Sequence, residues 1–123
     1  MALPDTISAS VKLRAEDTGG VLSVVDMAAG ADFTGPPLHH HAFDETFQVI
    51  EGELTFQLRD ELVTAGAGEV VFAPRDVPHT LANRSGAPAR YLLVCTPPGF
   101  ERYFAGEPGD WPEVVVDGPP IGA

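Results

Sequence analysis

Short apolar stretches interrupted by glycine and proline run along the whole chain, and this pattern most constrains the fold. The 123 residues include 13 glycines and 12 prolines, spread widely enough to leave little room for long helices. The stretches between them alternate polar and apolar residues or are rich in apolar residues, which is typical of β-strands joined by turns. Nine strands are predicted, at residues 8–14, 21–28, 37–41, 45–51, 53–58, 61–64, 69–73, 79–83 and 90–96.

The C-terminal part of the chain differs from this pattern. A short helix is expected at residues 100–105, because Phe100, Tyr103 and Phe104 would share one face. The tail at 106–123 is rich in proline and glycine and is expected to be irregular, apart from a possible edge strand at 113–117. No linker divides residues 1–123, so one all-β domain is predicted, closed on itself or packed as a sandwich.

Charge and composition exclude several classes of function. The net charge is -11 and the seven basic residues are scattered, which argues against nucleic-acid binding. No apolar run approaches the roughly 20 residues of a membrane span. The first five residues have neither the basic nor the apolar segment of a secretory signal. Cys95 is the only cysteine, which agrees with a reducing compartment, and the cytoplasm is the expected location.

Three of the four histidines stand together at positions 39–41. In an extended strand, His39 and His41 share a face while His40 points the other way. Glu45 would share the face of His39 and His41, but on an unbroken strand it would lie roughly 13 Å from His41. One metal ion cannot span that distance, so residues 42–44 must turn if the carboxylate is to join the imidazoles.

His79 completes a candidate metal-binding set with His39, His41 and Glu45. It follows two prolines, which stiffen the approach to its strand. Three neutral imidazoles and one carboxylate suit Fe, Mn, Ni, Cu, Co or Zn as divalent ions, and they leave positions open for water or substrate. The absence of thiolates from the set is more typical of a catalytic site than of a structural one.

The spacing of these residues resembles the two motifs of the cupin superfamily. The first motif is Gly-x5-His-x-His-x3/4-Glu-x6-Gly, within residues 35–52, and the second is Gly-x5-Pro-x-Gly-x2-His-x3-Asn, within residues 68–83. The matching residues are His39, His41, Glu45 and Gly52 in the first motif and Gly68, Pro74, His79 and Asn83 in the second.

Two positions depart from these motifs. Phe33 stands where the first glycine of the first motif is expected, and Gly35 follows two residues later. Asp76 replaces the internal glycine of the second motif, although aspartate tolerates left-handed backbone better than most residues.

The resemblance implies a single-domain jelly-roll β-barrel of the small bacterial cupin type, with four inward-facing metal ligands and a homodimeric assembly. It also implies an enzyme acting on an oxygenated small molecule, with dioxygenase-type oxidation of a phenolic or enolic substrate as the leading activity. Glu45 would then be both a ligand and the catalytic base. Two alternatives stay open: a zinc-dependent cyclase or isomerase of polyketide-like intermediates, and a cupin that binds a small molecule without turning it over.

Several other residues are expected to have packing roles. Cys95 is expected to be a small buried hydrophobe, and Trp111 an anchor for the tail. A set of apolar residues is interpreted as barrel core, with a pocket lining as the alternative: Phe47, Val49, Phe56, Phe72 and Leu81.

Overall fold

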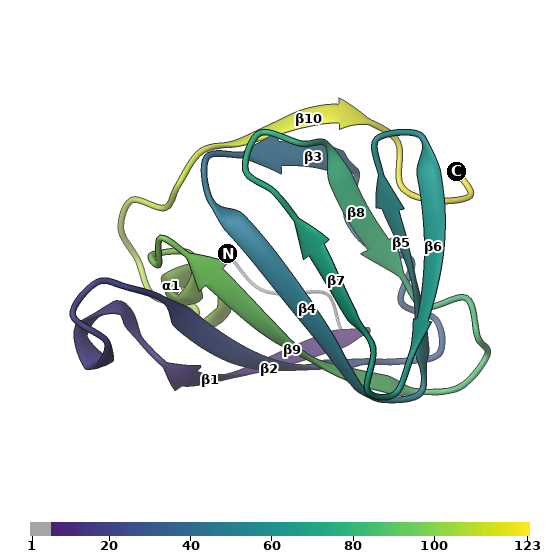
Figure 1. Ribbon diagram of the computed structural model, residues 1–123, viewed down its shortest axis with the longest axis horizontal. Coiled ribbons are helices and arrows are strands. Elements are labelled where there is room, and N and C mark those ends of the chain that lie inside the picture. The colour runs from purple at the N-terminus through teal and green to yellow at the C-terminus, as the bar shows by residue number, and fades with distance from the viewer. Residues whose placement is uncertain (1–5) are drawn as a thin grey trace.

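Two five-stranded antiparallel sheets face each other in the computed structural model, which describes residues 6–123 (Figure 1). Residues 1–5, on which the argument against a secretory signal rests, lie outside the described part. In spatial order the first sheet contains β1 (Ile7–Leu13), β2 (Ser23–Ala29), β9 (Ala89–Thr96), β4 (Asp44–Glu51) and β7 (Val70–Ala73). The second contains β10 (Val114–Gly118), β3 (Leu38–His41), β8 (His79–Ala82), β5 (Glu53–Leu58) and β6 (Glu61–Gly66).

This architecture confirms the predicted all-β jelly roll of the cupin type. The nine predicted strands are present, with ends that differ by at most two residues from those expected. The possible edge strand in the tail is β10, which pairs with β3. The short helix is α1 (Glu101–Phe104), and a 3-10 turn at Ala15–Asp17, which was not predicted, precedes β2. Among residues 6–123 no helix has the length and apolar character needed to cross a membrane.

Inward and outward side chains alternate along β4 and β9, and the inward ones form part of the core between the sheets. Glu45 pairs with Cys95 and Phe47 with Leu93, so these inward positions stack side by side across the two strands. Cys95 is fully buried, as predicted. The core prediction was wrong for Phe72, which is 51% exposed. Phe72 pairs with an outward residue of β4, while its neighbours on β7 occupy the inward face.

The two departures from the cupin motifs have local explanations. Gly35 has φ +81°, and a Cβ atom added there would lie 1.8 Å from the carbonyl oxygen of Leu81 on β8. A glycine is therefore required at this displaced position, because any side chain would push the segment before β3 away from β8. Asp76 adopts φ +65°, the left-handed conformation that the glycine of the motif would supply.

Candidate metal centre

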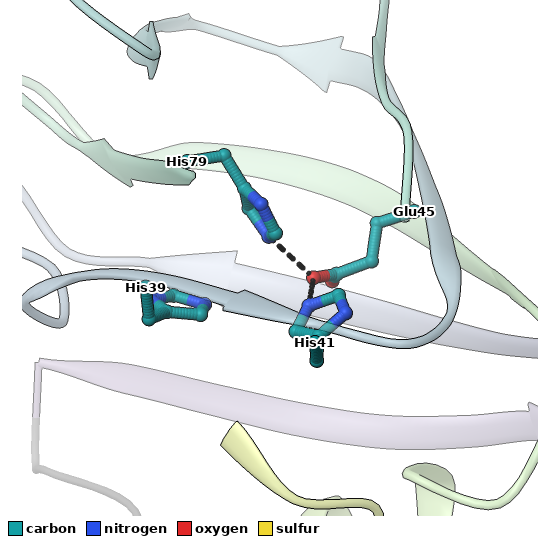
Figure 2. Close-up of side chains that lie close together, drawn as sticks. All are labelled: His39, His41, Glu45 and His79. Atoms are coloured by element: carbon teal, nitrogen blue, oxygen red, sulfur yellow. Dashed lines mark hydrogen bonds and ion pairs between the residues drawn. The ribbon is translucent and has the colours of Figure 1, made fainter. Parts of the chain in front are cut away.

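The four predicted metal ligands lie together at one end of the space between the sheets. Their potential ligand atoms all lie within 4.8 Å of one another, so the group could hold one metal ion. Figure 2 shows the three imidazoles and the carboxylate converging. His39 and His41 come from β3 and His79 from β8, where His39 and His79 are direct cross-strand partners, while Glu45 projects from β4 of the opposite sheet.

A sharp bend at Ala42 and Phe43 brings Glu45 back towards His41, as the sequence required. The ring of Phe43 stacks on the ring of His41, with centroids 3.6 Å apart and planes 6° from parallel. Nδ1 of His41 donates a hydrogen bond to the carbonyl oxygen of Phe43, 2.9 Å away. As a result, Nε2 of His41 lies 2.5 Å from Oε1 of Glu45, whereas a straight strand would leave the two residues far apart.

The loop before His79 is held against β3 and β4. The backbone N–H of Asp76 donates to the carbonyl oxygen of His41, at 2.8 Å. The backbone N–H and the guanidinium of Arg75 both donate to the Asp44 carboxylate, at 2.7 Å and 3.1 Å. These contacts set the position from which His79 enters the centre.

Each histidine of the centre uses the same ring nitrogen for support. Nδ1 of His39, His41 and His79 donates to a backbone carbonyl two residues away in the chain, at 2.6, 2.9 and 2.8 Å respectively. A carbonyl oxygen can only accept, so Nδ1 carries the proton. The Nε2 atoms are therefore left to act as electron-pair donors, and the rings are locked in orientation.

The Glu45 carboxylate faces two imidazole nitrogens, and this arrangement requires positive charge beside it. Its Oε1 lies 2.5 Å from Nε2 of His41 and 2.8 Å from Nε2 of His79. Two neutral imidazoles with protonated Nδ1 would direct lone pairs at this carboxylate, so the arrangement is stable only with extra protons or a cation. Burial raises the pKa of the Glu45 carboxyl, but the hydrogen bonds from His41 and His79 more than offset this and lower it to about 2.

The pKa values of two histidines move in opposite directions. Burial lowers the pKa of His39. Burial also acts to lower the pKa of His79, but its hydrogen bond to Glu45 and the negative charge there raise it overall. The ionised Glu45 carboxylate and the ring nitrogens that face it are ligand types that divalent transition metals prefer.

The centre opens into a cavity of about 500 Å³. Among residues 6–123, none that lines this cavity is a lysine or an arginine, and Glu45 is the acidic residue of the lining. Two members of the apolar set, Phe47 and Leu81, line it as well as belonging to the core. The cavity is mainly apolar, and seven aromatic residues contribute rings to its lining: Phe33, Phe47, Tyr91, Phe100, Tyr103, Phe104 and Trp111.

Helix α1 closes part of this cavity and is anchored by Glu101. The side chain of Glu101 is buried, at 1% exposure, and its two oxygens accept hydrogen bonds from the backbone N–H groups of Ala15 and Gly99, at 2.7 Å and 2.6 Å. Burial raises the pKa of its carboxyl, but these N–H groups more than offset this and lower it. Sequence reasoning missed Glu101, because its partner Ala15 lies 86 residues away.

Other residues take structural positions around the centre. His40 points away from the cluster and pairs with Asp117 of β10 at 2.7 Å, consistent with its predicted outward face. Asn83, the last residue of the second motif, donates to the carbonyl oxygens of Gly30 and Ala87 and so ties loops together. Trp111 packs edge-on against Tyr103 and lines the cavity, so it contributes to the site as well as anchoring the tail.

Comparison with solved structures shows the same fold in several proteins. The polyketide cyclase RemF from Streptomyces resistomycificus has 20% sequence identity and a TM-score of 0.70, over 91% of this chain and 71% of that one. KdgF from Halomonas sp. has 16% identity and a TM-score of 0.69, over 79% and 84%. The EutQ protein of Clostridium difficile has 22% identity and a TM-score of 0.61, over 75% of this chain and 63% of that one.

At these identities the likeness establishes the fold alone, and the chain spans less than two thirds of EutQ. No curated protein matches the sequence. The family model for the cupin domain matches residues 23–95, which include both motifs and all four candidate ligands. The chain therefore belongs to the cupin domain family.

Proposed function

We propose that this protein is a metal-dependent enzyme that acts on an oxygenated small molecule, with dioxygenase-type oxidation of a phenolic or enolic substrate as the leading activity. The observation that carries the proposal is the convergence of three oriented imidazoles and one carboxylate at the end of an apolar cavity. Cavities of this kind bury most of a small ligand and use a few polar groups to orient it.

The donor set fits a divalent Fe, Mn, Ni, Cu, Co or Zn ion, held by His39, His41, Glu45 and His79. When bound, such an ion supplies Lewis acidity at a substrate oxygen and, if redox-active, one-electron chemistry with O2. The hydrogen bonds from Nδ1 to backbone carbonyls hold each imidazole ready for this role.

The chain's own residues would bind the substrate and move a proton. The aromatic rings of the cavity would hold a flat molecule and exclude water from the reacting end. Glu45 is ionised at neutral pH and is the candidate base. Its Oε1 faces the two imidazoles, so its second oxygen, Oε2, would take the proton of a substrate hydroxyl.

A second candidate function is a zinc-dependent cyclase or isomerase of polyketide-like molecules. It is favoured by the likeness to RemF, a polyketide cyclase, which extends over 91% of this chain. The two activities differ in their need for O2: an oxygenase consumes it together with the substrate, whereas a zinc cyclase or isomerase works equally well under nitrogen.

Metal content, measured by mass spectrometry on untagged protein, tests the proposal. Near-stoichiometric metal is expected in the wild type and in His40→Ala, and a loss of metal is expected in His79→Ala. His40→Ala is the matched control, because it removes an imidazole from the same strand that faces away from the centre. A wild type that contains no metal and takes none up on reconstitution would contradict the enzyme proposal and favour a binding-only cupin.

Three further expectations stay predictions: one domain over residues 1–123, a homodimer and a cytoplasmic location. Sedimentation of the purified protein distinguishes a monomer from a dimer at micromolar concentration.

A further inference from the structure

Position 33 departs from the first cupin motif and faces the cavity. The motif has a glycine at this position, whereas the chain has Phe33, which is 5% exposed and lines the cavity. The close approach to β8 that requires a glycine is instead at Gly35, where a Cβ atom would lie 1.8 Å from the carbonyl oxygen of Leu81. Because the glycine is supplied two residues later, position 33 is free to carry a large side chain.

Backbone hydrogen bonds hold Phe33 far from the metal centre. Its N–H donates to the carbonyl oxygen of Gly30 at 3.1 Å, and its carbonyl oxygen accepts a hydrogen bond from the N–H of Asn83 at 2.8 Å. Asn83 follows the last residue of β8 and is four residues beyond His79, so an extended chain places it roughly 13 Å from that ligand. The loop between β2 and β3 accordingly lies at the end of the sandwich away from α1 (Figure 1).

The cavity reaches the same depth along the opposite sheet. Cys95 of β9 is the cross-strand partner of Glu45, and Tyr91, four residues before it, still lines the cavity. By the rise of a strand, Tyr91 is also roughly 13 Å from the level of Glu45. Ala89, the next inward residue of β9, is buried in the core and is not part of the lining. The cavity therefore extends from the metal centre to the level of Tyr91 and Phe33 and ends there.

We propose that Phe33 is the end wall of the cavity and limits the length of a ligand that is bound at the metal centre. The proposal rests on the proposed function, because the length of the ligand is measured from the four candidate metal ligands. Among residues 6–123 the cavity lining has no lysine or arginine, and its carboxylate belongs to the metal centre, so the far end favours an uncharged group. The ligand class is thus a molecule with a metal-binding oxygen at one end and an uncharged apolar body of limited length.

Linear alkyl hydroxamic acids, from acetohydroxamic acid to dodecanohydroxamic acid, measure this length. The hydroxamate group binds a divalent metal ion through its oxygens, and the alkyl chain extends from it. Uptake of Zn²⁺ is measured first for every protein. Each hydroxamic acid is then titrated calorimetrically into Zn²⁺-loaded wild type, Phe33→Ala and Phe104→Ala. Phe104→Ala is the matched control, because it removes a phenyl ring that lines the same cavity but belongs to α1.

In the wild type, affinity is expected to rise about 4-fold with each added methylene group, as apolar burial gives, and to stop rising once the chain reaches Phe33. In Phe33→Ala the rise is expected to continue for about two or more further methylene groups, because the ring no longer blocks the chain. Phe104→Ala is expected to keep the length limit of the wild type. Phe33→Leu, which keeps an apolar side chain in the core, is expected to have an intermediate limit and tests the proposal if Phe33→Ala does not fold.

Three outcomes would overturn the role of Phe33 and leave the proposed function intact. A length limit that is unchanged in the Phe33 variants would mean that another residue ends the cavity. A limit that moves in Phe104→Ala instead would place the alkyl chain towards α1. A Zn²⁺-loaded wild type whose affinity does not depend on chain length would place the chain outside the cavity. A wild type that takes up no metal would contradict the proposed function, and the Phe33 proposal with it, before any hydroxamic acid is added.

Discussion

Two buried carboxylates, Glu45 and Glu101, illustrate two different uses of a charge inside the same fold. Both are nearly inaccessible, at 7% and 1% exposure, and both have a lowered pKa. Glu101 accepts hydrogen bonds from two backbone N–H groups. Glu45 instead faces two imidazole nitrogens whose rings already donate through their other nitrogen.

The difference lies in what each carboxylate still requires. Backbone N–H groups cannot lose their protons, so Glu101 is satisfied within the protein and serves to fix α1. The nitrogens that face Glu45 carry a proton only when the imidazoles are positively charged, so a cation can take the place of those protons. A buried carboxylate surrounded by ring nitrogens is thus a candidate ligand, and one surrounded by main-chain donors is a structural anchor.

The largest expected effect is a difference in metal affinity between variants of the two carboxylates. Glu45→Gln removes a charged ligand, and we expect its metal affinity to fall by at least the roughly 100-fold that the loss of a supporting contact can cost. Glu101→Gln, the matched control, is expected to retain wild-type affinity. Isothermal titration with Zn²⁺ measures both. Equal losses in the two variants would mean that the carboxylates do not differ in role.

Metal should stabilise the folded protein through Glu45 and its neighbours. At a free metal concentration 100 times Kd, the free energy of unfolding is expected to rise by about 2.7 kcal/mol. Urea denaturation with and without Zn²⁺ measures the change, and a chelator should reverse it. Glu45→Gln should gain much less at the same concentration, and an equal gain would place the bound metal elsewhere.

Glu101 should contribute to stability rather than to metal binding. Glu101→Gln places an amide NH2 group against one of the two backbone donors, so we expect the free energy of unfolding to fall by about 1–3 kcal/mol. Urea denaturation of the metal-free protein measures this loss. A variant as stable as the wild type would show that the two N–H groups find other acceptors and that Glu101 is not an anchor.

Lowering the pH should remove the contribution of the ionised Glu101 carboxylate to the free energy of unfolding. Its folded-state pKa is below the ordinary value of 4.5, so its stabilisation is complete above that pH and is lost as the pH falls towards the folded-state pKa. The stability difference between the wild type and Glu101→Gln should therefore shrink below pH 4.5, in metal-free protein. Because Glu45 is present in both, its own titration cancels. A difference that stays constant down to pH 3 would contradict this account.

The smallest effect is expected at a partly exposed carboxylate, that of Asp44. Arg75→Ala removes the guanidinium from Asp44, but the Arg75 side chain is exposed, Asp44 is partly exposed, and the backbone N–H of Arg75 still donates to Asp44. The melting temperature should stay within experimental error of the wild type. A clear decrease would show that this pair, and not only burial, holds the loop before His79.

The grouping of the four candidate ligands could be predicted from sequence, because most of these residues follow local rules. His39 and His41 share a face by strand alternation, and the need for a turn before Glu45 followed from a simple distance. The position of His79 came from the resemblance to the second motif. In each case the relevant information lies within a few residues or within a known spacing.

The remaining features depend on contacts between distant segments. Glu101 meets Ala15 across 86 residues, and no local pattern marks either of them as partners. Phe72 was placed inside because it is apolar, yet the register of β7 on β4 turns it outward.

The pairing of β10 with β3 has a consequence for how new specificities can arise in this protein. The family match ends at residue 95, yet much of the cavity wall lies beyond it, in Phe100, Tyr103, Phe104, Trp111, Val114 and Val116. Replacing this C-terminal stretch would therefore change the shape of the cavity without altering the four candidate metal ligands. A replacement segment must still end in a strand that pairs with β3, the strand that carries His39 and His41.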